Sequence, residues 1–131
     1  MCQPTSSSRL GAEHKKLGWV QDIKTLDMSD RTLSDMAKMP ELKSLSLIGG
    51  EFFLAKHNRD ILQACLDRNL DVRVVTNATI INDRLLDYLK KIKNLELQIS
   101  IDGHGDAYEF ARYPGKWETV SRNIELLNQE L

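Results

Sequence analysis

The sequence has little cysteine and no excess of charge of one sign. Its 131 residues include two cysteines, Cys2 and Cys65, too few for a disulfide framework or for a complete metal site built by this chain alone. Lysine and arginine total 18 against 19 aspartates and glutamates, so the chain lacks the basic surface that nucleic acids require. The sequence therefore excludes a disulfide-stabilised module and predicts no nucleic-acid partner.

Long hydrophobic runs are also missing. The apolar stretches last only a few residues, and the one at 45–48 is interrupted by Ser46, so none could span a bilayer. The N-terminus holds cysteine, glutamine, proline and serines where a signal peptide would need an apolar stretch. We therefore expect a cytoplasmic protein with no membrane partner. Hydrophobic residues at 41% and charged residues at 28% are typical of a globular chain, and the length suits one domain.

An alternation of strand and helix patterns begins near residue 40. Three short apolar runs predict strands at 45–48, 72–75 and 95–99. Apolar residues at helical spacing predict helices over 57–69, from Asn82 and from Trp117. Strands that are separated by helix-length crossovers pair in parallel. The fold class expected is therefore α/β, with a parallel sheet of βα units over residues 40–131.

The two ends of the chain differ from this middle part. Residues 1–18 have the composition of an irregular loop, and a helix is expected from Ser29 to just before Pro40. The apolar stripe of the last helix still runs at Leu131, and a sheet of three strands leaves an edge unpaired, so we expect a piece of a larger domain. Cys65 falls on an apolar helical stripe and is expected to be a small buried hydrophobe.

Small or polar residues follow every predicted strand. They are Gly49, Gly50 and Glu51 after the first, Thr76 and Asn77 after the second, and Ser100 and Asp102 after the third. Taken singly, each group could be no more than a turn. Because the carboxyl ends of parallel strands share an edge, we expect the three groups to flank one concave surface. Strand alternation places Ser100 and Asp102 on the inward side. The same alternation directs Ile99 and Ile101 toward the helices.

These strand-end segments carry a family resemblance. In their order and spacing, Leu47–Glu51, Val75–Thr79 and Ile99–Gly103 resemble the motifs of radical S-adenosylmethionine (SAM) enzymes. The later Ala111–Glu118 and Asn123–Ile124 are similar to the branch that carries SPASM or twitch C-terminal domains. The resemblance implies that residues 1–131 form part of a partial (β/α) barrel, similar to a TIM barrel. It also implies a [4Fe-4S] cluster on three cysteines spaced C-x-x-x-C-x-x-C, SAM on the remaining iron, and an electron donor for the cluster.

The resemblance also assigns roles to single residues. The positions that match the family's SAM-binding motifs are Gly49, Gly50 and Glu51 at the amino group, Thr76 and Asn77 at the pocket wall, Ser100 and Asp102 at the ribose and carboxylate region, and Arg112 at the carboxylate or the substrate. As a metal ligand, Cys2 matches the third cluster cysteine, and the first two are absent from the sequence. Phe52 replaces the usual proline of the first motif, and Ala78 replaces the usual glycine of the second.

The implied function is radical modification of a peptide or a small metabolite. With one matching cysteine, this chain is expected not to assemble the cluster and to be inactive as it stands. Two alternatives stay open. One is a leucine-rich-repeat-like scaffold, because Leu42–Leu47 is similar to such a repeat and the strand centres near 46, 74 and 98 lie 28 and 24 residues apart. The other is a module that keeps the SAM pocket without a cluster.

Overall fold

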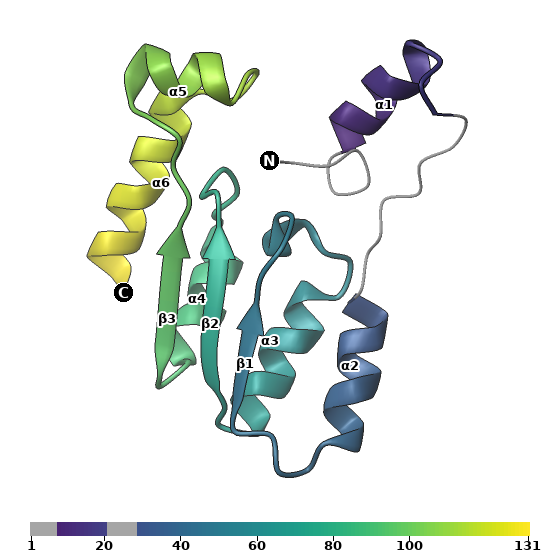
Figure 1. Cartoon of the computed structure of the whole chain (residues 1–131). Coiled ribbons are helices and arrows are strands. Elements are labelled where there is room, and N and C mark those ends of the chain that lie inside the picture. The colour runs from purple at the N-terminus through teal and green to yellow at the C-terminus, as the bar shows by residue number, and fades with distance from the viewer. Residues whose placement is uncertain (1–7, 21–28) are drawn as a thin grey trace.

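The computed structural model describes residues 8–20 and 29–131, and it is a mixed α/β fold around one parallel sheet. The sheet has three strands in the order β1–β2–β3: β1 (Ser44–Leu47), β2 (Asp71–Thr76) and β3 (Leu95–Ile99). Figure 1 shows the three arrows side by side and pointing the same way. The expected fold class, with strands at these three places, is confirmed.

The register of the sheet brings the three strand ends to one edge. Val74 of β2 lies opposite Leu47 of β1 on one side and Leu97 of β3 on the other. Both pairings are parallel. The segments that leave the strands, which carry the predicted site residues, therefore begin at the same edge of the sheet.

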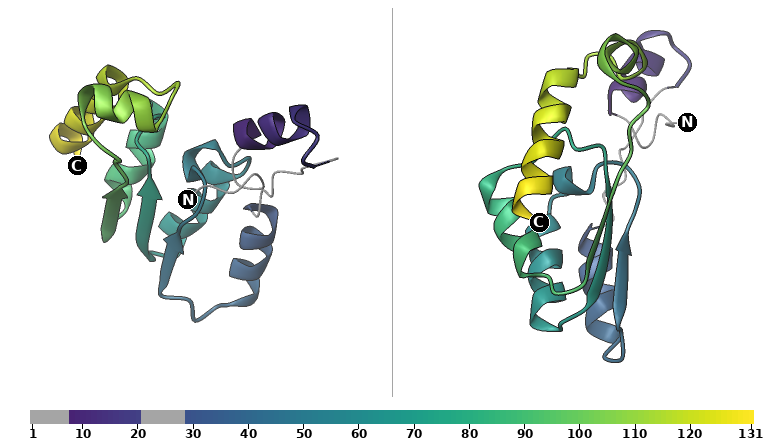
Figure 2. Two further views of the ribbon diagram at one scale, coloured as in Figure 1. Left: turned by 45° about the horizontal axis from the view of Figure 1, so that its top comes forward. Right: turned by 90° about the vertical axis from the view of Figure 1, so that its left-hand side faces the viewer.

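Helices cover one face of this sheet. Those that pack there are α2 (Ser29–Lys38), α3 (Asn58–Asp67), α4 (Asp83–Lys91) and α6 (Trp117–Glu130). The right-hand view of Figure 2 shows α3, α4 and α6 on the same side of the strands. Helix α4 starts where the sequence predicts. Asn82 Oδ1 accepts a hydrogen bond from Leu85 N at 3.0 Å and so caps the helix. No helix within the described residues is long and apolar enough to cross a membrane.

The hydrophobic core lies between the sheet and these helices. Val72 and Val74 of the central strand are buried against Ile61, Leu62 and Cys65 of α3. Cys65 is 1% exposed, which confirms that it is a buried hydrophobe. Burial raises the pKa of its thiol to about 11, partly opposed by the charge of Arg68.

The other face of the sheet is polar and uncovered by helices. The residues that alternate with the core residues are exposed there: Ser44 and Ser46 on β1, Asp71 and Arg73 on β2, and Glu96 and Gln98 on β3. Arg73 Nε lies 3.2 Å from Glu96 Oε1, and Arg73 Nη2 donates to Gln98 Oε1 at 2.8 Å. In a (β/α) barrel the helices cover only the outer face of the sheet, so the uncovered face corresponds to the inward side of such a barrel.

Three details differ from the sequence-based expectations. Part of the expected irregular loop 1–18 is the helix α1 (Ser8–Lys16), whose last turn carries His14, Lys15 and Lys16, groups that favour a helix C-terminus. A further short helix, α5 (Gly105–Ala111), follows β3. Ile101 is 42% exposed, so its predicted packing against the helices is wrong. The reason is that β3 ends at Ile99, where the strand alternation stops. Ile99 itself does pack against the core.

The core makes a direct prediction about stability. Leu62 has no exposed surface, so Leu62→Ala should lower the free energy of unfolding by about 2–5 kcal/mol through lost burial and the cavity that it leaves. Leu54, in the 3₁₀ turn η1 (Phe52–Leu54), is 66% exposed, and Leu54→Ala is the matched control with an expected change within about 0.5 kcal/mol. Urea unfolding followed by circular dichroism measures both variants. Equal losses in the two would contradict this assignment of the core.

Candidate functional site

The Glu51 side chain joins the loops that follow β1 and β2. Its Oε1 accepts a hydrogen bond from Thr76 Oγ1 at 2.8 Å, and its Oε2 accepts one from Asn77 N at 2.9 Å. Glu51 is also the N-cap residue of η1, where Oε1 receives a longer contact of 3.4 Å from Phe53 N. Two predicted site segments are therefore in direct contact, although they lie 25 residues apart in the sequence.

Gly49 and Gly50 present bare backbone beside this contact. Their φ angles are +104° and +57°, a region that residues with a Cβ rarely adopt. A Cβ added at either glycine would meet no atom within 4 Å, so the space around them is open. Within residues 8–20 and 29–131, neither carbonyl oxygen accepts a backbone hydrogen bond. The loop can therefore offer carbonyl acceptors to a cationic ligand group, such as an ammonium.

The segment after β2 is held in a sharp turn. Thr76 is 1% exposed, and its Oγ1 accepts a hydrogen bond from Ala78 N at 3.1 Å. Ala78 is fully buried with φ +56°. This backbone angle is the physical reason for a glycine at the corresponding place in the family's motif, since alanine adopts it at a cost of about 1–2 kcal/mol. Asn77 Oδ1 accepts from Thr79 N at 2.9 Å, which closes the turn.

Ser100 continues the edge from β2 to the segment after β3. Ser100 N donates to Thr76 O at 2.9 Å, one residue beyond the end of β3. Asp102 follows, and its Oδ2 forms an ion pair with Arg112 Nε at the C-terminus of α5. The two side chains are 55% and 30% exposed, so each keeps surface that a ligand could reach. The structure thus pairs two residues that the resemblance had assigned separately.

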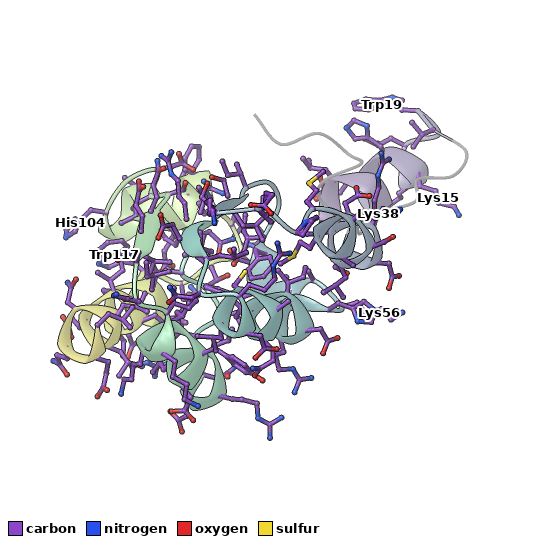
Figure 3. All side chains as sticks on the ribbon, turned by 90° about the horizontal axis from the view of Figure 1, so that it is seen from below. Lys15, Trp19, Lys38, Lys56, His104 and Trp117 are labelled. Atoms are coloured by element: carbon purple, nitrogen blue, oxygen red, sulfur yellow. The ribbon has the colours of Figure 1, made fainter. Side chains whose placement is uncertain are left out.

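A small aromatic cluster supports the Asp102–Arg112 pair. Tyr108 of α5 is 2% exposed, and burial raises the pKa of its hydroxyl. Gly103 passes so close that a Cβ there would lie 3.2 Å from Tyr108 N. The Trp117 ring centroid lies 5.5 Å from that of Tyr108 and 5.1 Å from that of His104. Figure 3 shows His104 and Trp117 together, on the opposite side of the molecule from Trp19.

One buried polar residue near the site entered the sequence analysis only as part of a family motif and not as a site residue. Asn123 of α6 is 5% exposed, and its Nδ2 donates to Ala78 O at 2.8 Å. The signal was present in the sequence, because Asn123 occupies the same face of the helix as the buried Val120 and Leu127. An amide on an apolar stripe needs a hydrogen-bond partner.

Cys65 does not fit a [4Fe-4S] cluster. Such a cluster needs cysteine thiolates, and Cys65 is a buried thiol with a raised pKa inside the core. Cys2, the predicted metal ligand, lies outside the described residues. Among the residues that the structure does describe, no group of three or more histidine, cysteine, aspartate or glutamate side chains could hold a metal ion.

The polar groups at the strand ends do fit the charges of SAM in kind. SAM carries an ammonium, a carboxylate and two ribose hydroxyls. The edge offers the carbonyls of Gly49 and Gly50, which accept no backbone hydrogen bond from the described residues, the carboxylate of Asp102 and the guanidinium of Arg112. A groove of about 350 Å³ lies elsewhere, beside β3 and the last turns of α4 and α6, and is lined by Leu95, Leu97 and their neighbours. Its lining includes none of the predicted site residues.

Comparison with known proteins gives one positive result. A family model described as the radical SAM superfamily matches residues 1–130, nearly the whole chain. No curated protein matches the sequence.

The Glu51 contact predicts the effect of an isosteric change. Glu51→Gln replaces one acceptor oxygen by an NH₂ group that can only donate to Thr76, and it removes the negative charge that both hydrogen bonds share, so the free energy of unfolding should fall by about 1–3 kcal/mol. Glu125→Gln, an exposed change in α6, should alter it by less than about 0.5 kcal/mol. Thermal and urea unfolding of both variants measure the difference. An unchanged stability of Glu51→Gln would show that the two loops are not held by this carboxylate.

Proposed function

Because the chain belongs to the radical SAM superfamily, we propose that its sheet edge binds SAM as part of an enzyme core that modifies a peptide or a small metabolite by radical chemistry. The observation that carries this proposal is the Glu51 contact, which fixes the loops after β1 and β2 against each other. Preorganised loops bind a ligand with less loss of conformational entropy than free ones do.

Each group at the edge has a proposed task. The carbonyls of Gly49 and Gly50 accept hydrogen bonds from the SAM ammonium, and the Asp102 carboxylate accepts from the ribose hydroxyls. Arg112 stays paired with Asp102 and directs its remaining N–H groups to the SAM carboxylate or to the substrate. Thr76 and Asn77 form the wall of the pocket between these two regions.

The radical chemistry depends on a group that these described residues do not hold. A [4Fe-4S] cluster, for which Cys2 is the proposed ligand in this chain, would supply the electron for radical formation from SAM, and an external donor would supply the electron to the cluster. This chain's part is to bind and orient SAM. We also propose that the enzyme belongs to the SPASM or twitch branch, which Ala111–Glu118 and Asn123–Ile124 support. We also place it in the cytoplasm, where thiols stay reduced.

A second candidate is a SAM-binding module without a cluster. It is favoured by one contrast, since the polar groups for SAM are present at the edge while Cys65 is buried in the core. The family match lends no support to the leucine-rich-repeat alternative.

Titration of the ¹⁵N-labelled chain with SAM tests the binding proposal. We expect saturable amide shifts at Gly49, Gly50 and Asn77, because these backbone groups adjoin the proposed ligand. Asp102→Asn should raise the dissociation constant for SAM by about tenfold or more, the usual effect of losing a charged hydrogen-bond acceptor. Asp106→Asn, an exposed change in the first turn of α5, is the matched control and should leave it within about twofold. Shifts confined to the groove beside β3, or none at all, would contradict the proposal.

Reconstitution separates the cluster-bearing enzyme from the module. The chain has two cysteines, of which Cys65 is buried in the core, so Cys2 is the thiol left to bind iron. We therefore expect anaerobic treatment with iron and sulfide to load far less than four irons per chain. Iron and sulfide analysis of the desalted monomer, with a Cys2→Ser variant as the control, measures the loading. Stoichiometric four-iron loading of the monomer would overturn this expectation.

A further inference from the structure

Asn123 is a buried amide on the apolar side of α6. It is 5% exposed, between Val120 at 1% and Leu127 at 3% on the same helix face. Its Nδ2 donates to Ala78 O at 2.8 Å, a contact that spans 45 residues. A buried polar side chain costs stability unless it is hydrogen-bonded. We therefore expect the Asn123 amide to have a role that an apolar residue at this position could not fill.

The Asn123 amide acts on the backbone of Ala78. The residue is fully buried and has φ +56°, a conformation that disfavours any side chain with a Cβ. Its N–H donates to Thr76 Oγ1 at 3.1 Å, and its carbonyl accepts from Asn123. Hydrogen bonds on both sides of Ala78 therefore hold it in a conformation that alanine would otherwise avoid.

The same hydrogen bonds lead on to the strand-end loops. Thr76 Oγ1, which accepts from Ala78 N, donates in turn to Glu51 Oε1 at 2.8 Å. Asn77 N, the neighbouring amide, donates to Glu51 Oε2 at 2.9 Å. A change in the backbone of Ala78 would displace both donors of the Glu51 contact. Asn123 is thus connected, through four residues, to the loop that holds Gly49 and Gly50.

We propose that Asn123 is a positioning residue of the sheet edge: its amide holds Ala78 in the left-handed conformation and so sets the geometry of Asn77 and Glu51 for the ligand. This inference rests on the proposed binding of SAM at that edge. Asn123 does not touch the ligand and acts through the Ala78 carbonyl. A residue whose only task was to pack α6 against the sheet would not need to donate a hydrogen bond.

Removal of the amide tests the proposal. Asn123→Ala and the volume-filling Asn123→Leu both leave the Ala78 carbonyl without its donor, and the second keeps the helix packed if the first unfolds. We expect SAM to bind about fivefold to tenfold more weakly to each. The strong intraresidue NOE between the amide and Hα protons of residue 78, typical of positive φ, should weaken. Asn128→Ala, an exposed change on the same helix, should alter neither.

A second substitution separates positioning from packing. Glycine adopts positive φ without steric cost, so Ala78→Gly combined with Asn123→Ala should recover at least half of the lost affinity on a logarithmic scale. The same change removes a buried methyl group but also relieves the steric cost of positive φ, so the melting temperature should change little from that of Asn123→Ala. We therefore expect affinity to recover without a matching recovery of stability, which a packing role alone would not produce.

The outcomes distinguish this inference from the function on which it rests. If the unsubstituted chain binds SAM and the Asn123 variants lose only stability, the positioning role is wrong. It is also wrong if Ala78→Gly restores none of the lost affinity for SAM. If the unsubstituted chain binds no SAM, the proposed function fails, and the NMR spectra of the variants still test whether Asn123 positions the loop. Displaced amide signals at Asn77 and Gly50 in Asn123→Leu would uphold it, whereas changes confined to α6 would overturn it.

Discussion

The carboxylate of Glu51 joins the loops that follow β1 and β2, and the arrangement of the site depends on this contact. Parallel pairing brings the ends of β1 and β2 to one edge but does not fix the loops beyond them. Hydrogen bonds from Thr76 Oγ1 and Asn77 N to the two oxygens of Glu51 do so. With Glu51 held in this way, the exposed backbone of Gly49 and Gly50 has a defined position at the edge of the sheet.

The two faces of the sheet explain where a ligand can approach. Helices α2, α3, α4 and α6 bury the apolar face, and Figure 2 shows α3, α4 and α6 on that side of the strands. On the opposite face, Arg73 contacts both Glu96 and Gln98. A ligand at the carboxyl edge therefore meets polar groups from the loops and the polar face of the strands. This is the arrangement in which α/β enzymes place their sites, with the rigid sheet below and the functional groups on the loops above.

The sequence predicted most of what depends on local pattern. The strands followed from short apolar runs, and their parallel pairing followed from the helix-length segments between them, so the common edge of Glu51, Asn77 and Asp102 could be expected. Contacts between distant residues could not. Nothing in the spacing of Asn123 and Ala78 indicates that an amide and a carbonyl 45 residues apart would meet. Ile101 was misplaced because strand alternation was carried past Ile99, where β3 ends. The roles assigned to the site residues toward SAM stay predictions.

A crystal structure of the chain with SAM bound tests the central claim most directly. The account predicts the SAM ammonium within hydrogen-bonding distance of the Gly49 or Gly50 carbonyl and the ribose beside Asp102, with the Glu51 contacts to Thr76 and Asn77 intact. SAM in the groove beside β3, or at the sheet edge with its ammonium turned away from both glycines, would contradict it.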